Sequence, residues 1–327
     1  MTVIAAQRLT MTFRTPVRDP GLRAAVASLV RRTYRSVEAV RDISFAVAAG
    51  ELVGFIGPNG AGKTTTLKLL SGVLHPTSGA ADVLGFTPWR RDHRFLRQIA
   101  MVRGSRPLAV PAELTVLDAL RFQQLIYEVP EEQFRRNLAE LVDLLTLEPL
   151  LQRQARALSL GEKMRAGLAW SLIYRPRVLF LDEPTIGLDV GVVATIRRFV
   201  ADYCAQTGAT VLLTSHAMAD VETLCRRVIL IDHGALVYDG DLAGLSLRLA
   251  PYKLLTVTLG DEGAVDLAVF GELVARDGPR VSLRVPRAQV PAVTARLLAE
   301  LPVSDLSVAE PTLEQVIGQV YREGVPT

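Results

Sequence analysis

Residues Gly57-Pro58-Asn59-Gly60-Ala61-Gly62-Lys63-Thr64 fit the pattern G-x-x-x-x-G-K-[ST] and directly follow an apolar run, Leu52–Ile56. A helix is predicted next, from Thr65 to Leu70. A strand, a glycine-rich loop and a helix in this order bind phosphate, because the N–H groups of the loop and the positive end of the helix dipole face the anion. We expect nucleotide contacts from residues 57–65, with Lys63 between the β- and γ-phosphates and the Thr64 hydroxyl on Mg²⁺.

A second apolar run, Val178–Leu181, ends in two carboxylates, Asp182 and Glu183. The carboxyl ends of parallel strands form the edge where ligands bind in open α/β sheets. There Asp182 can hold Mg²⁺ through a water, and Glu183 can polarise the attacking water. His216 follows the next apolar run and is expected at the same edge. Asp182 and Glu183 could also simply cap the next helix, but the loop at 57–64 favours a catalytic role.

A third segment, Leu158-Ser159-Leu160-Gly161-Glu162, stands at the start of a predicted helix, Lys163–Ile173. Ser159 and Glu162 have the spacing of a capping box. A serine with free N–H groups at a helix start can also bind an anion. The position of this segment, about 20 residues before Asp182, favours the second role.

These segments, in this order, resemble the ATP-binding cassette (ABC) family, specifically the nucleotide-binding subunits of ABC transporters. The resemblance covers about residues 3–243, with a Walker A loop at 57–64, a signature segment at 158–162, a Walker B strand at 178–183 and a histidine loop ending at His216. Asp189, in Ile186-Gly187-Leu188-Asp189, stands at the position of the family's D-loop.

The resemblance implies how such a subunit works. Two cassettes, either two copies of this chain or this chain with a paralogue, are expected to dimerise head to tail around two ATP molecules with Mg²⁺. Each ATP lies between one Walker A loop and Ser159 and Gly161 of the partner subunit, and Glu183 and His216 are the catalytic residues. Hydrolysis reopens the dimer and drives separate membrane permease subunits. The motifs look most like those of ABC-2-type exporters.

A rival expectation is a soluble ABC ATPase that acts on ribosomes or DNA. Members acting on translation carry two cassettes in one chain, and members acting in DNA repair carry long coiled coils. This sequence shows neither feature. A simple P-loop kinase or GTPase does not fit either, because it would not combine the segment at 158–162 with His216.

Two positions depart from the family pattern. The family has a glutamine after the strand-like run Ile99–Val102, where it contacts Mg²⁺ and the attacking water. Here we expect Ser105 to take that place, with Thr64 and Asp182, around the metal; Gln98 is the less favoured candidate. The signature also reads Ser-Leu-Gly-Glu where Ser-Gly-Gly-Gln is common. Glu162 therefore puts a carboxylate where a neutral glutamine is usual.

The family stacks the adenine ring on an aromatic side chain near the end of the first strand. Phe13, at the end of Leu9–Phe13, has the spacing of that strand, and Tyr34 has the spacing to the strand that follows. We favour Phe13 as the adenine contact and keep Tyr34 as the alternative.

An arginine-rich insertion, residues 14–36, separates these two expected strands and holds six arginines against a single acid, Asp19. Apolar residues share one face if the insertion is helical; they are Leu22, Val26, Leu29 and Thr33. A basic amphipathic helix can lie on anionic lipid, and the ABC subunits of polysaccharide exporters look similar here. The other interpretation is a helix docked on its own domain.

Apolar strands alternate with helical stretches up to about residue 243, which predicts an α/β fold with a mostly parallel sheet. With the resemblance, we expect a P-loop NTPase cassette at 1–243 that includes an antiparallel β subdomain and a helical subdomain at 90–174. Strands at Lys253–Leu259 and Val281–Val285 and two further helices predict a small C-terminal α/β accessory domain at 245–327.

The composition narrows the setting. The 49% hydrophobic and 22% charged residues exclude a disordered or fibrous chain. No apolar run reaches the roughly 18–20 residues of a membrane span, and Cys204 and Cys225 form no ligand motif. A net charge of +3 with 6% aromatic residues predicts no nucleic-acid partner. We expect a peripheral subunit on the cytoplasmic face of the cell membrane.

Overall fold

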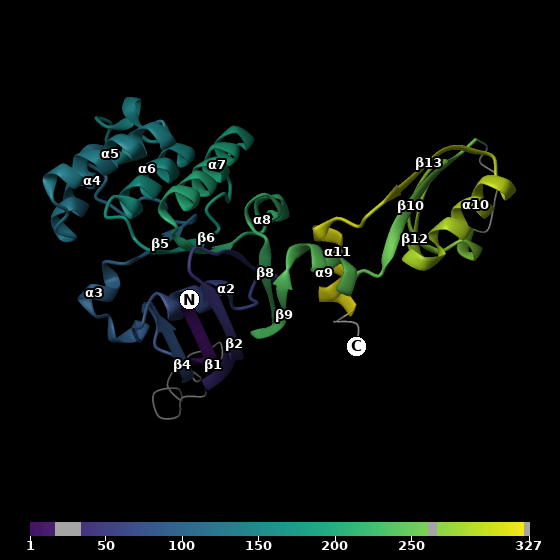
Figure 1. Cartoon of the computed structure of the whole chain (residues 1–327), viewed down its shortest axis with the longest axis horizontal. Helices are drawn as coiled ribbons and strands as arrows, with labels where there is room; N and C mark the ends of the chain where they lie inside the picture. The colour runs from purple at the N-terminus through teal and green to yellow at the C-terminus, as the bar shows by residue number, and fades with distance from the viewer. Residues whose placement is uncertain (17–33, 261–266, 324–327) are drawn as a thin grey trace, which may run out of the picture. The chain divides into compact units, whose positions relative to one another are not determined.

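The computed structural model describes residues 1–16, 34–260 and 267–323, and the chain divides into two compact units, Met1–Gly240 and Asp241–Thr327. Figure 1 traces the order of the elements along the chain. The first unit holds the predicted motifs, and the second is described separately below.

A six-stranded sheet forms the centre of the first unit, in the order β5-β6-β7-β3-β8-β9. The strands are β5 (Ile99–Arg103), β6 (Val178–Asp182), β7 (Thr210–Thr214), β3 (Leu52–Ile56), β8 (Arg227–Asp232) and β9 (Ala235–Asp241). Neighbours from β5 to β8 run parallel. All five residues of β6 and of β7 are buried, as expected for strands covered on both faces. The predicted mostly parallel α/β sheet is confirmed.

A three-stranded antiparallel sheet lies beside it, in the order β2-β1-β4, built from β1 (Thr2–Pro16), β2 (Tyr34–Ala48) and β4 (Ser78–Val83). Strands β1 and β2 are longer than expected, because Arg14 pairs with Ser36 and Pro16 pairs with Tyr34. The predicted insertion at 14–36 is therefore wrong at both of its ends, which are strand. Its middle part, with the predicted amphipathic helix, lies outside the described residues.

Helices gather on one side of the parallel sheet (Figure 1). They are α4 (Val116–Ile126), α5 (Glu131–Leu145), α6 (Leu160–Leu172) and α7 (Val190–Thr207). Helix α5 begins directly after Pro130 with Glu131 and Glu132 in its first turn, where acids favour the positive end of the dipole. Shorter elements complete the unit: α2 (Lys63–Leu70), α3 (His93–Leu96), α8 (Met218–Leu224), and 3-10 turns at Pro88–Arg90, Glu148–Leu150 and Ala155–Ala157.

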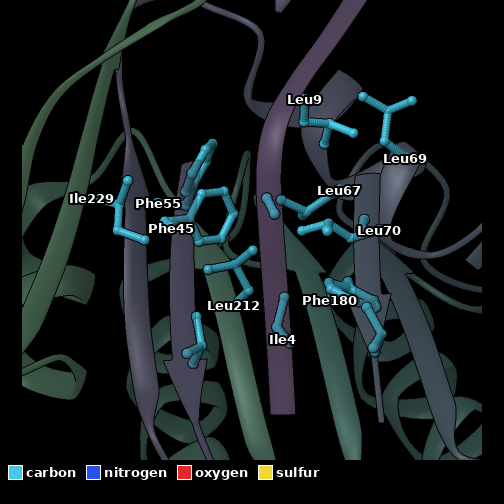
Figure 2. Packing of buried hydrophobic residues seen from close by; sticks show 14 of the residues in the cluster. Ile4, Leu9, Phe45, Phe55, Leu67, Leu69, Leu70, Phe180, Leu212 and Ile229 are labelled. Atoms are coloured by element: carbon cyan, nitrogen blue, oxygen red, sulfur yellow. The ribbon is translucent and has the colours of Figure 1, made fainter. Parts of the chain in front are cut away.

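The main core of the first unit fills the space between its two sheets. Figure 2 shows side chains from both sheets and from α2 packed together. The labelled residues come from β1 (Ile4, Leu9), β2 (Phe45), β3 (Phe55), α2 (Leu67, Leu69, Leu70), β6 (Phe180), β7 (Leu212) and β8 (Ile229). Because α2 is anchored in this core, the loop that precedes it is fixed against both sheets.

The second unit is a four-stranded antiparallel sheet in the order β11-β12-β10-β13. Its elements are α9 (Leu242–Leu249), β10 (Tyr252–Leu259), β11 (Glu272–Asp277), β12 (Arg280–Pro286), α10 (Val290–Glu300), β13 (Val303–Ala309) and α11 (Leu313–Glu323), with 3-10 turns at Leu267–Val269 and Arg287–Gln289. Strands β10 and β12 and helices α10 and α11 match the sequence prediction. Helix α9 and the edge strands β11 and β13 were missed; β11 is exposed along its whole length and shows no buried periodicity.

The packing of the core predicts how much stability is lost when a buried aromatic side chain is truncated. Phe180 is fully buried in β6 between the two sheets, so Phe180→Ala should lower the free energy of unfolding by about 3–5 kcal/mol. Urea denaturation of the full chain measures this. Phe122→Ala, at a half-exposed position on α4, is the matched control and should change the value by no more than about 0.5 kcal/mol. Equal effects of the two substitutions would contradict the placement of the core.

Candidate active site

The loop at 57–62 joins β3 to α2 at the carboxyl edge of the parallel sheet. Two of its glycines are forced by neighbouring backbone. A Cβ on Gly62, which has φ +104°, would lie 2.2 Å from the Ala39 carbonyl oxygen, and one on Gly57 would lie 2.4 Å from that of Ile231. Real Cβ contacts do not reach such distances, so β2 and β8 hold the loop from both sides. The tip, Asn59 and Gly60, is exposed.

Lys63 begins α2 and turns its side chain back over the loop. Its Nζ donates to the carbonyl oxygens of Gly57 (2.6 Å) and Pro58 (3.0 Å), and the residue is buried. Burial lowers the pKa of the Lys63 ammonium from its ordinary value, whereas the nearby Glu183 and Asp182 carboxylates act in the opposite direction. The cation thus lies within the loop, as phosphate binding requires.

Oxygen ligands meet where α2 approaches β6 and β7. The Thr64 hydroxyl lies 2.9 and 3.0 Å from the two oxygens of Asp182, and the Thr214 hydroxyl donates to Oδ1 of Asp182 at 2.9 Å. Among the described residues no group of three or more histidine, cysteine or acidic side chains could hold a metal ion. A hydroxyl and one carboxylate fit Mg²⁺, which completes its shell with phosphate oxygens and waters.

Glu183 and His216 lie together at the ends of β6 and β7. His216 Nε2 is 2.8 Å from Glu183 Oε1, and both side chains are partly exposed. The backbone of Glu183 has φ +53°, a left-handed conformation that is uncommon for a non-glycine residue. Its N–H donates to the carbonyl and hydroxyl oxygens of Thr214, each at 3.1 Å. Thr214, which the sequence did not indicate, therefore fixes the Asp182 carboxylate and the backbone of Glu183.

Ser105 lies at this edge and Gln98 does not. The N–H of Gly104 donates to the Asp182 carbonyl oxygen at 2.8 Å. A Cβ on Gly104 would lie 1.9 Å from the carbonyl oxygen of Glu183. Ser105, which is exposed, directly follows this backbone contact. Gln98 precedes β5 at the opposite edge, where it bonds to Arg177 and to the Arg94 carbonyl. Of the two candidates, Ser105 lies at the edge of the sheet that carries Asp182 and Glu183, and its role at a metal site stays a prediction.

The signature segment caps α6. The Ser159 N–H donates to Glu162 Oε2 (2.7 Å), and the Glu162 N–H donates to Ser159 Oγ (3.3 Å), so the predicted capping box forms. Arg153 Nη1 contacts Glu162 Oε1 at 2.5 Å. The Ser159 N–H and the Arg153 guanidinium hold the pKa of Glu162 below its ordinary value. The unusual carboxylate is thus balanced by Arg153, which the sequence analysis missed.

Three predicted contacts stay apart from the phosphate loop in the single chain. Within the described part of the chain, Ser159, Gly161 and Asp189 make no hydrogen bond to residues 57–65. Ser159 and Asp189 are exposed, and Asp189 caps α7 without a side-chain bond. The contacts of these positions with a second cassette stay a prediction.

Phe13 and Tyr34 differ in their distance from the loop along the strands. Phe13 is partly exposed and pairs with Val37, two residues from Ala39, whose carbonyl packs against Gly62. Tyr34 pairs with Pro16, farther along the ladder. The register therefore favours Phe13 as the adenine contact, which stays a prediction.

The fold and the arrangement of this site define a nucleotide-binding cassette, and comparison with known proteins agrees. The family model described as "ABC transporter" matches residues 40–186, and that of the "EvrA-like ABC transporter, C-terminal domain" matches residues 251–309. The chain belongs to the ABC transporter ATP-binding proteins, and its activity is the binding and hydrolysis of ATP.

Individual relatives are similar along most of the chain. The doxorubicin resistance ATP-binding protein DrrA of Mycobacterium tuberculosis is 31% identical over 308 residues, which are 90% of this chain and 92% of DrrA. The linearmycin resistance ATP-binding protein LnrL of Bacillus subtilis is 28% identical over 304 residues, 89% of this chain and 96% of LnrL. A solved ATP-binding subunit of an ABC transporter shares the fold, with a TM-score of 0.62, 24% identity, and coverage of 75% of this chain and 92% of that one.

The Glu183–His216 pair predicts a separation of binding from hydrolysis. Glu183→Gln keeps the loop and Lys63 intact but removes the carboxylate that polarises water, so kcat should fall by on the order of 10²–10⁴-fold while ATP still binds. An ATP-bound dimer should accumulate and elute early in size-exclusion chromatography. Hydrolysis at the parent rate by this variant would exclude the role of Glu183.

Proposed function

We propose that two such cassettes, two copies of this chain or this chain with a paralogue, hydrolyse ATP with Mg²⁺ and thereby drive export through a separate ABC-2-type permease. The observation that carries this proposal is the meeting of Lys63, Thr64, Asp182, Glu183 and His216 at one edge of the sheet. Phosphoryl transfer needs positioning and charge stabilisation more than covalent chemistry, and these residues offer both.

Each residue has a separate task in this mechanism. Lys63 and the N–H groups of 57–62 bind the phosphates, and the Thr64 hydroxyl and Asp182 hold Mg²⁺, which neutralises charge on the phosphate oxygens when bound. Glu183 accepts a proton from the attacking water and orients it. His216, bonded to Glu183 Oε1, holds that carboxylate in place.

The second cassette supplies Ser159 and Gly161 of the partner subunit to the γ-phosphate side. Near these positions the chain exposes apolar side chains that a monomer would normally bury: Leu160 (44% exposed), Ile186 (48%) and Val190 (86%). Leu160 approaches the D-loop, because a Cβ on Gly187 would lie 3.6 Å from Leu160 Cδ2. An exposed apolar group beside Asp189, whose side chain does not cap α7, suits an interface with another cassette.

Ser105 takes the place of the family's glutamine in this proposal. If its hydroxyl bonds a metal-bound water, then Ser105→Gln should leave ATP affinity nearly unchanged and alter the Mg²⁺ dependence of kcat, because a longer amide reaches the metal shell differently. Titration of Mg²⁺ at saturating ATP measures this. Gln98→Ala, at the opposite edge of the sheet, is the control and should keep the parent profile. An unchanged profile in Ser105→Gln would remove Ser105 from the metal site.

A groove offers a docking place for the permease. It has a volume of about 210 Å³ and lies between α2, β5 and the helices α4 and α6. Its lining includes Val73, Met101, Gln123, Trp170 and the stacked pair of Tyr127 and Tyr174. Beside it α4 exposes apolar side chains, Phe122, Leu125 and Ile126. We assign this groove to a short cytoplasmic helix of the permease, because such a helix can bury these apolar groups.

The proposed export direction is supported by the names of the relatives. DrrA and LnrL are named for resistance to doxorubicin and linearmycin, which supports export of such a compound. In the part of the chain that is described, every helix is too short or too polar to cross a bilayer. We place the subunit at the cytoplasmic face of the membrane. A contact of the arginines in 14–36 with anionic lipid stays a prediction, because 17–33 lie outside the described residues.

Co-purification tests the proposed coupling. The chain is co-expressed with a candidate ABC-2-type permease that the parent chain binds. Leu125→Glu should abolish co-purification and transport, since a charge replaces an exposed apolar contact. ATP hydrolysis by the isolated chain should be unchanged. Leu298→Glu changes a similarly exposed leucine of the second unit and should keep the complex. Retention of the complex by Leu125→Glu, or its loss in both variants, would contradict docking in this groove.

A further inference from the structure

A buried carboxylate behind the catalytic pair has no role in the mechanism above. Asp220, in the first turn of α8, is 1% exposed. Burying a charged group costs free energy unless it is paired and hydrogen-bonded. Asp220 is fully paired, and its three partners come from three different parts of the site.

The first two partners flank the catalytic residues. Asp220 Oδ2 accepts hydrogen bonds from the Thr185 hydroxyl (2.5 Å) and from the Ser215 hydroxyl (2.7 Å). Thr185 is two residues after Glu183, and Ser215 directly precedes His216. One carboxylate oxygen therefore joins the segments that carry the two members of the Glu183–His216 pair.

The third partner joins the D-loop to this cluster. Arg197 on α7 contacts Asp220 Oδ1 through Nε at 2.6 Å and through Nη2 at 2.5 Å. Helix α7 begins directly after Asp189, and the turn that leads to Asp189 starts at Thr185, whose carbonyl accepts the Leu188 N–H at 3.3 Å. Asp220 thus contacts the segments on both sides of the D-loop, residues 185–189. It bonds Thr185 at the start of the loop and Arg197 in the helix α7 that follows it.

We propose that Asp220 is a positioning residue for ATP hydrolysis, which fixes the Glu183–His216 pair and the D-loop as one unit. A carboxylate suits this place because it only accepts hydrogen bonds and has enough lone pairs for two hydroxyls and a guanidinium. An asparagine would turn an N–H₂ group toward either the hydroxyls or Arg197, and the charge opposite Arg197 would be lost. The inference rests on the roles proposed for Glu183 and His216.

The test separates positioning from binding. In the full chain, Asp220→Asn should lower kcat by on the order of 10- to 100-fold, because small displacements of reacting groups cost this much. The dissociation constant for ATP should stay at the parent value, since the contacts of residues 57–64 do not involve Asp220. Thr185→Val should also lower kcat, and Thr185→Ser, which restores the hydroxyl, should recover it. Thr185→Val keeps the test open if Asp220→Asn fails to fold.

A matched control removes another buried polar cluster. Asn137 on α5 is 5% exposed; it donates to the Ile173 carbonyl (2.8 Å) and accepts from Arg175 Nε (3.1 Å), at the opposite edge of the sheet. Asn137→Leu should lower the melting temperature and leave kcat at the parent value. If Asp220→Asn and Asn137→Leu lower kcat alike, or if Asp220→Asn leaves kcat unchanged, Asp220 has no positioning role.

A parallel Glu183→Gln measurement distinguishes the two levels of the proposal. Loss of hydrolysis in Glu183→Gln together with parent activity in both Asp220→Asn and Thr185→Val overturns only the role of Asp220. Parent activity in Glu183→Gln overturns the proposed mechanism itself, and the inference about Asp220 falls with it.

Discussion

The contact on which the site depends is between backbone atoms. The carbonyl oxygens of Ala39 and Ile231 approach Gly62 and Gly57 so closely that no side chain fits there. Ala39 belongs to the antiparallel sheet and Ile231 to the parallel sheet. The phosphate loop is therefore in contact with both sheets, and its shape requires that both sheets are folded and correctly packed. The core of Figure 2 supplies this packing, because side chains of α2 lie between the sheets.

Charges around the site are neutralised in local pairs. The ammonium of Lys63 lies close enough to Glu183 and Asp182 for the two carboxylates to oppose the effect of burial on its pKa. Arg153 balances Glu162 in the signature segment, and Arg197 balances Asp220 behind the histidine. Removing one partner of a buried ion pair leaves an uncompensated charge. The stability lost in this way is far larger than the stability gained from an exposed ion pair.

The sequence predicted those features that depend on a short motif with fixed spacing. The phosphate loop, the carboxylates after Val178–Leu181 and the capping box of Ser159 with Glu162 each follow from spacing within one short segment, and the structure places each where expected. Family resemblance added the order and the partner roles, which spacing alone does not give. The start of α5 at Glu131 followed from a proline and two acids.

What the sequence did not predict depends on residues distant along the chain. Arg153 and Glu162 are brought together by the 3-10 turn at Ala155–Ala157, and Asp220 contacts Thr185 from 35 positions away. The strand ends at Arg14 and Ser36 carry arginine and polar residues, so no apolar alternation marks them, and only their pairing makes them strand. Strand β11, at the edge of its sheet, likewise shows no apolar alternation, because all of its residues are exposed.

The backbone of Glu183 shows how strand pairing affects the position of a proposed catalytic residue. A left-handed backbone at a non-glycine residue costs on the order of 1 kcal/mol or more, and it persists here because Thr214 accepts the Glu183 N–H through both its carbonyl and its hydroxyl. The register that pairs Asp182 with Thr214 between β6 and β7 makes this possible. A slip of that register by one residue would turn the Thr214 hydroxyl to the other face of the sheet. The Asp182 carboxylate would then lose one hydroxyl donor and the Glu183 N–H would lose one acceptor. The parallel pairing of two buried strands therefore fixes the backbone that carries both carboxylates.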